Sequence, residues 1–169
     1  GIETVIGGSG DDRLTGDAGD NRFVGGLGDD AIDGGAGFDT LDLSAATGPI
    51  AVDFVRGTVS GAGIGTDSFA NIEKLLFGAG NDTVTGGNGD EAFDGGAGND
   101  TVDAGAGDDT VDAGSGNDVI LAGAGNDVVD GGSGDDRIAG GAGDDALTGG
   151  SGHDAFVFAA GFGKDTISD

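Results

Sequence analysis

Apolar residues return every nine positions along most of this chain, each in the same setting of glycine and aspartate. From Gly7 the sequence reads GGSGDDRLT, GDAGDNRFV, GGLGDDAID and GGAGFDTLD, and the pattern returns nine more times between Phe77 and Val157. The shared template is Gly-Gly-x-Gly-x-Asp-x-apolar-x, with Gly at position four in all thirteen copies and Asp at position six in eleven. A short constant period is typical of stacked repeats, whereas flexible linkers have no fixed apolar register.

The template predicts short strands around position eight, separated by glycine-rich turns. Position eight is apolar in every copy, at Leu14, Phe23, Ile32, Leu41, Val84, Phe93, Val102, Val111, Ile120, Val129, Ile138, Leu147 and Phe156. Because strand side chains alternate, position eight faces a core while its neighbours face solvent. Two repeats then make one coil of eighteen residues, and each strand pairs in parallel with the strand one coil later. In the second block, one sheet is predicted to carry Val84, Val102, Ile120, Ile138 and Phe156, and the other Phe93, Val111, Val129 and Leu147.

The repeats fall into two blocks with a different segment between them. We divide the chain into a lead-in strand with the first block at residues 1–42, a β-strand spacer at 43–76, a second block at 77–157, and a C-terminal cap or the start of a further spacer at 158–169. The spacer alternates apolar residues at Ile50, Val52 and Phe54 and holds the only proline, Pro49. Residues 2–6 enter the first block as residues 72–76 enter the second. We therefore expect the chain to belong to a longer series of blocks and spacers.

Composition adds a strong negative charge to this picture. The 169 residues include 42 Gly, 32 acidic and 6 basic residues, and the formal net charge is −26. Such a charge argues against nucleic acid or an anionic membrane as a partner and indicates a cationic ligand. The absence of Cys excludes disulfides and thiolate metal sites, and no apolar stretch is long enough to span a bilayer.

The spacing of the position-six carboxylates favours calcium as that ligand. Adjacent parallel strands lie about 4.7–4.9 Å apart, so carboxylates one coil apart are expected on the order of 5 Å from each other. Calcium–oxygen distances are about 2.3–2.6 Å, so one Ca²⁺ fits between two such oxygens, and backbone carbonyls of the glycine-rich turns complete its shell. Mg²⁺ fits less well because it is smaller and dehydrates reluctantly, and the lack of Cys with a single His disfavours transition metals.

The template resembles the RTX nonapeptide, GGxGxDxUx, the hemolysin-type repeat of secreted Gram-negative proteins. This resemblance implies an all-β fold, a parallel β-roll wound as a right-handed solenoid, with calcium ions held between turns. The spacer with its flanking repeat residues, which reads DTLDLSAATG, IAVDF and GTDSFANIEKLLFGAGNDTVTG, also resembles spacers of such proteins.

Carried over residue by residue, the resemblance implies metal ligands at position six. In the first block they pair as Asp12 with Asp30 and Asn21 with Asp39. In the second block one edge carries Asp82, Asp100, Asp118, Asp136 and Asp154, and the other carries Glu91, Asp109, Asp127 and Asp145. Asp165 lies in a similar turn displaced by two residues and is expected to close the last site, which gives nine or ten calcium ions. Asn21 supplies no charge and Glu91 is longer than Asp, so these two sites depart from the family pattern.

The resemblance implies a calcium-dependent folding and secretion module. We expect a secreted, extracellular or cell-surface location, export of the parent chain by type I secretion machinery, and no catalytic residues in this segment, as in the modules of secreted proteases, lipases and epimerases. A second interpretation is an adhesin segment or a polysaccharide-binding module of a bacterial surface protein, whose ligand would be a polysaccharide or another surface component.

Overall fold

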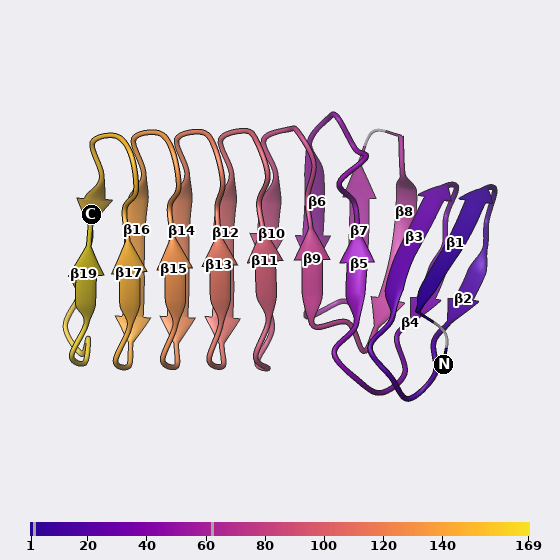
Figure 1. Ribbon diagram of the computed structural model, residues 1–169, viewed down its shortest axis with the longest axis horizontal. Helices are drawn as coiled ribbons and strands as arrows, with labels where there is room; N and C mark the ends of the chain where they lie inside the picture. The colour runs from indigo at the N-terminus through magenta and orange to yellow at the C-terminus, as the bar shows by residue number, and fades with distance from the viewer. Residues whose placement is uncertain (2, 62) are drawn as a thin grey trace.

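The described part of the chain folds into β-strands joined by turns, and the strands stack into a solenoid (Figure 1). The computed structural model describes residue 1, residues 3–61 and residues 63–169, so Ile2 of the predicted lead-in lies outside the described residues. Within these ranges there is no helix, and hence none that could cross a membrane. The all-β, parallel β-roll predicted from the repeat is confirmed.

Two sheets face each other along the length of the solenoid. In the part of the chain that the structure describes, one has nine strands, in the order β1 (Thr4–Ser9), β3 (Arg22–Leu27), β5 (Thr40–Asp42), β9 (Lys74–Leu76), β11 (Ala92–Asp94), β13 (Thr110–Asp112), β15 (Val128–Asp130), β17 (Ala146–Thr148) and β19 (Thr166–Ser168). The other has ten within the described residues, in the order β18 (Ala155–Phe156), β16 (Arg137–Ala142), β14 (Val119–Ala124), β12 (Thr101–Ala106), β10 (Thr83–Thr85), β6 (Ile50–Asp53), β7 (Thr58–Gly61), β8 (Gly65–Ala70), β4 (Ala31–Asp33) and β2 (Arg13–Thr15).

The strands of the second block pair in parallel in the predicted register. Val84 lies opposite Val102, and the series continues through Ile120 and Ile138 to Phe156 in the ten-stranded sheet. In the nine-stranded sheet, Phe93, Val111, Val129 and Leu147 form the facing series. The eighteen-residue coil is therefore confirmed.

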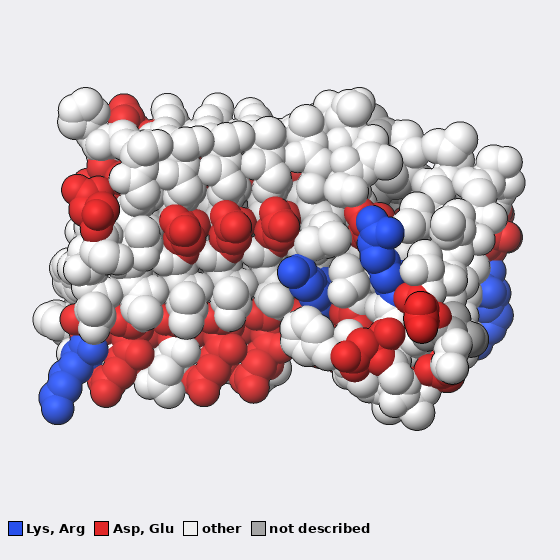
Figure 2. Space-filling model, viewed as in Figure 1, with Lys and Arg blue, Asp and Glu red and all other residues white. Residues whose placement is uncertain are grey.

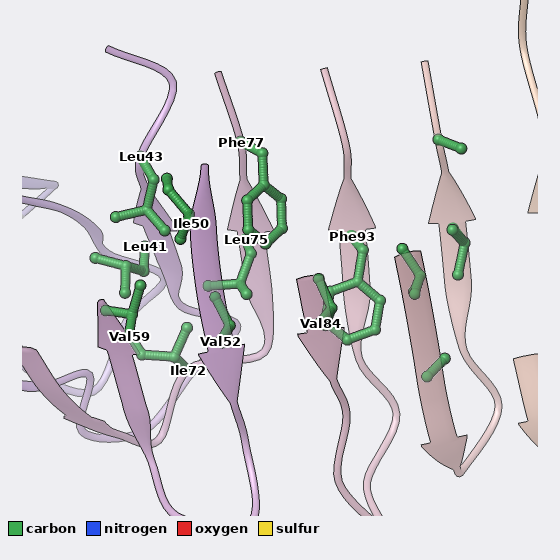
Figure 3. Close-up of a cluster of buried hydrophobic side chains, with 14 of the residues drawn as sticks. Leu41, Leu43, Ile50, Val52, Val59, Ile72, Leu75, Phe77, Val84 and Phe93 are labelled. Carbon is green, nitrogen blue, oxygen red and sulfur yellow. The ribbon is translucent and has the colours of Figure 1, made fainter. Parts of the chain in front are cut away.

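The core is a single thin layer between the sheets. Position-eight residues such as Phe23, Leu41 and Ile138 are fully buried, and so are the position-one alanines Ala104 and Ala113. Side chains from the spacer and from both blocks belong to this one cluster, part of which Figure 3 shows. The core is therefore narrow, and much of the fold rests on stacked backbone.

The spacer is built into the sheets and does not interrupt the solenoid. Strand β5 of the first block pairs directly with β9, which pairs with β11 of the second block. On the other side β6, β7 and β8 form an antiparallel meander, in which β8 continues from β4 and β6 leads to β10. The ring of Phe54 lies 5.0 Å from that of Phe69 and 5.6 Å from that of Phe93, which joins the meander to the second block.

The C-terminal segment adds one further coil with a shifted register. Strand β19 pairs with β17, and Ala146 lies opposite Thr166, twenty residues later instead of eighteen. The predicted displacement by two residues is confirmed. The rings of Phe158 and Phe162, 5.2 Å apart, lie within the loop that holds the extra residues.

Candidate metal centre

The turns stack because their glycines adopt a backbone that other residues rarely take. Gly114 and Gly116, at positions two and four, have φ of 92° and 142°. A Cβ built on Gly116 would lie 1.6 Å from the carbonyl oxygen of Gly98, in the turn one coil earlier on the same edge. Ser115 between them donates its N–H to the carbonyl of Gly96 at 2.9 Å. Successive turns therefore lie backbone against backbone.

The position-six carboxylates form a hydrogen-bonded series along each edge, which we call the carboxylate ladder. In ten cases the N–H of a position-six residue donates to the carboxylate of its counterpart one coil later, at 2.7–3.3 Å. These bonds join Asp12 to Asp30, Asn21 to Asp39, Asp82 to Asp100, Asp100 to Asp118, Asp118 to Asp136, Asp136 to Asp154, Glu91 to Asp109, Asp109 to Asp127, Asp127 to Asp145 and Asp145 to Asp165. All of the predicted pairs are thus brought together, and their assignment as calcium ligands stays a prediction.

The second oxygen of most ladder carboxylates is buried without a hydrogen-bond partner among the described residues. This holds for Oδ2 of Asp30, Asp39, Asp82, Asp100, Asp109, Asp118, Asp127, Asp136, Asp145, Asp154 and Asp165. Most of these residues are almost completely enclosed, such as Asp118, which is 1 % exposed, whereas Asp154 and Asp165 are partly exposed. A buried charged oxygen with no partner is costly, so the arrangement requires either protonation or a bound cation.

The electrostatics of the ladder lead to the same requirement. Burial, and to a smaller extent the neighbouring ladder carboxylates, raise the pKa of Asp100, Asp109, Asp118 and Asp127 from the ordinary value near 3.8 to about 6. For Asp118 the neighbour is Asp136. Two carboxylates on adjacent coils therefore resist being charged together unless a cation lies between them.

The donor set fits calcium. No three His, Cys, Asp or Glu side chains converge on one point within the described residues, so any cation must draw further ligands from the carbonyls of the turns. These are all oxygen donors, which Ca²⁺ prefers. The one histidine, His153, is almost fully exposed in a turn, with Nδ1 3.4 Å from Oδ1 of Asp135, away from the buried oxygens. Bound calcium would neutralise the negative charge of the buried Oδ2 atoms.

Asn21 and Glu91 differ from the other position-six residues. The side-chain oxygen of Asn21 accepts the N–H of Asp17 at 2.8 Å, and the carboxylate of Glu91 accepts the N–H groups of Gly87 and Gly89 at 3.1 and 3.3 Å. Both side chains thus fold back onto their own turns. Each belongs to the first turn of its block along that edge, where no regular nonapeptide turn precedes it.

A second ladder, at position five, was not predicted from the sequence. Here the N–H of a position-five residue donates to the side-chain oxygen of the position-five residue one coil earlier. The direction is opposite to that of the carboxylate ladder, in which the acceptor lies one coil later. Asn117 donates to Asn99 at 2.7 Å, and Asp135 donates to Asn117 at 2.8 Å. The available signal was that position five is Asp or Asn in eleven of the thirteen copies.

Two spacer residues that the sequence did not single out also join the carboxylate ladder. The N–H of Asp30 donates to Asp67 at 2.9 Å, and the N–H of Asp39 donates to Glu73 at 2.8 Å. Asp67 is 2 % exposed, and burial raises its pKa to about 6. Gly63 and Gly65 lie before Asp67 at the template spacing, and this was the signal that could have found it.

The outward faces of the sheets carry further acidic residues. Asp94, Asp112 and Asp130, at position nine, lie side by side in register across the nine-stranded sheet. Burial and the two flanking carboxylates raise the pKa of Asp112. Figure 2 shows acidic side chains in lines along the solenoid, with few basic ones among them. The negative charge is therefore ordered along the stack.

Comparison with known proteins agrees with this geometry. A family model described as RTX calcium-binding nonapeptide repeat (4 copies) matches residues 1–41 and, in overlapping segments, residues 78–102, 85–120, 94–129, 103–138, 121–156 and 130–167. Together these segments cover well over half of the chain. No curated protein matches it.

Proposed function

Because the chain belongs to the family of RTX calcium-binding nonapeptide repeats, it is a calcium-binding β-roll, and we propose that calcium binding drives its folding after secretion. The observation that carries this proposal is the series of buried Oδ2 atoms without a partner. They make the folded chain unstable when the carboxylates are charged and no cation is present.

The proposed mechanism is a linkage between folding and ion binding. Without calcium, like charges in the ladder repel one another, and 42 glycines increase the entropy lost on folding. Calcium binds the ladder only when two coils are stacked, so it favours the folded form over the unfolded one. A chain made where free calcium is scarce then stays unfolded and exportable, and it folds where calcium is abundant.

We further propose that the module is the non-catalytic part of a larger secreted or cell-surface protein exported by type I secretion machinery. The buried carboxylates of the ladder are committed to hydrogen bonds and to a cation, and His153 is exposed in a turn. These observations support the proposal that catalysis or ligand binding by the parent protein lies outside the ladder.

Far-ultraviolet circular dichroism during a calcium titration tests the folding proposal. We expect an unfolded spectrum in chelator at neutral pH, a cooperative gain of β-structure on adding calcium, and a much weaker response to magnesium. A full β-spectrum in chelator at neutral pH would refute the proposal.

A further inference from the structure

The spacer contains a turn that has the structure of a repeat although the family model does not match it. Gly63, Gly65, Asp67 and Phe69 occupy template positions two, four, six and eight. Both glycines have positive φ, 91° and 82°, as in the regular turns. These residues lie between the matched segments, which end at residue 41 and resume at residue 78.

This turn stacks on the preceding one as regular turns do. A Cβ on Gly65 would lie 2.1 Å from the carbonyl oxygen of Gly28, just as a Cβ on Gly28 would lie 2.6 Å from that of Gly10. Phe69 lies opposite Ile32 in a parallel pair and is buried in the common core. The close backbone contact therefore continues from the first block into the spacer.

Both hydrogen-bond ladders also continue into this turn. The N–H of Asp30 donates to Oδ1 of Asp67 at 2.9 Å, as in the carboxylate ladder. The N–H of Thr66 donates to Oδ1 of Asp29 at 2.8 Å, as in the position-five ladder. Asp30 is 2 % exposed, and its Oδ2 is buried without a partner among the described residues. The partnerless oxygen beside this turn is thus that of Asp30, while Asp67 adds a carboxylate that is itself 2 % exposed.

Asp67 also lies beside open space next to the preceding turn. It lines a cavity of about 230 Å³ whose polar side is formed by Gly25, Gly26, Gly63 and Asp42, and whose remaining wall is apolar, from residues that include Val24, Leu27, Leu43 and Ile64. A carboxylate and the backbone of a glycine-rich turn thus line the same cavity. These are the donor types that calcium takes in an all-oxygen shell.

We infer that residues 63–70 act as a further repeat and that Asp67 binds a calcium ion against the turn of residues 25–30. The inference rests on the proposed function only in taking calcium as the ion. It places an ion in the spacer and so extends the calcium sites of this edge from Asp12 through Asp30 to Asp67. The first series of calcium sites on this edge ends at Asp67. One coil before Asp82, the place of a position-six carboxylate is taken by Ile50, which donates its N–H to the carboxylate of Asp82 at 2.8 Å.

Counting bound ions in the full chain tests this inference. Native mass spectrometry at saturating calcium would compare the unchanged chain with D67N and with the control D53N. Asp53 lies in the same spacer but is ion-paired at the surface with Arg56, so its loss changes the charge equally without touching the ladder. We expect D67N to bind one ion fewer than the unchanged chain and D53N to bind the same number. An unchanged count in D67N would overturn the inference.

A crystal structure of the unchanged chain grown with calcium avoids any folding defect of the variant. An anomalous-scattering peak within coordination distance of Asp67 would support the inference. Peaks along the regular repeats but none at Asp67 would overturn it and leave the proposed function standing. Peaks at none of these positions in a folded chain would refute both.

Discussion

The backbone N–H of Asp100 donates to Oδ1 of Asp118 at 2.7 Å, while Oδ2 of Asp118 is buried without a partner among the described residues. One carboxylate therefore serves two purposes: it fastens the preceding turn, and it offers a charged oxygen to a cation. This explains the preference for Asp at position six. Asn would keep the acceptor but place an N–H donor where the cation requires an oxygen.

Substitution of Asp118 separates these two purposes. We expect D118N to keep the hydrogen bond from Asp100 but to require more calcium for folding, since one charged ligand is lost. D118A loses the acceptor as well, and stability at saturating calcium should fall by about 1 kcal/mol more than in D118N, the typical net value of a hydrogen bond. Calcium-dependent circular dichroism with thermal unfolding measures both.

The control for Asp118 is D103N, which removes the same charge from the exposed outward face of β12. Its calcium midpoint should match that of the unchanged chain. If D103N and D118N shifted the midpoint equally, overall charge and not the ladder would control folding.

Glycine at position four is predicted to matter in one turn and not in another. Gly116 has φ of 142°, and a Cβ there would lie 1.6 Å from the carbonyl oxygen of Gly98. G116A should therefore lose at least about 2 kcal/mol through backbone strain and separation of the turns. Gly19 has no positive φ, and its nearest contact would be the Asp17 side chain at 3.5 Å, so G19A should be tolerated. Equal thermal stability of the two variants in calcium would contradict this account.

Glu91 is predicted to stabilise the first turn of the second block along its edge. Its carboxylate accepts the N–H groups of Gly87 and Gly89. E91A should lower the stability of the calcium-loaded protein by about 1 kcal/mol because these donors lose their acceptor, whereas E91Q retains one and should lose less. Chemical unfolding at saturating calcium distinguishes the two, and identical curves for E91A and E91Q would argue against the role.

The repeat predicted most of the solenoid because turn, strand and core residue recur at one spacing. Position eight gave the inward face, and the eighteen-residue coil followed from alternation. The path of the spacer could not be predicted in this way. Ile50, Val52 and Phe54 indicated a strand, but nothing local to them specifies that β5 pairs with β9 while a meander fills the other sheet. That arrangement depends on contacts between segments far apart in the chain.

The ladder was predictable in its pairs but not in its hydrogen bonds. Spacing alone placed Asp100 near Asp118, whereas the division of each carboxylate into a bonded and an unbonded oxygen needs the backbone of the turn. Asp67 was missed because its turn does not follow the first block at the nine-residue spacing of the repeats. The fold-back of Asn21 and Glu91 was missed because it depends on what precedes their turns.

The last prediction concerns pH, which should act in opposite directions with and without calcium. The pKa values of Asp100, Asp109, Asp118 and Asp127 are about 6 in the calcium-free fold, raised first by burial and then by neighbouring carboxylates, against about 3.9 in an unfolded chain. As the pH falls from 6 to 4, the folded form takes up protons that the unfolded form does not, so the calcium-free fold gains stability. Calcium requires deprotonated ligands, so its affinity falls through the same range.

We therefore expect metal-free protein to gain β-structure by circular dichroism as the pH is lowered from 7 to 4.5. We also expect a several-fold higher calcium concentration to be needed for folding at pH 5.5 than at pH 7.5. The variant D109N serves as the control, because an amide at position 109 does not titrate and should weaken both trends. Loss of β-structure on acidification of the metal-free protein would show that the buried carboxylates do not govern folding, since their neutralisation would then have brought no stability.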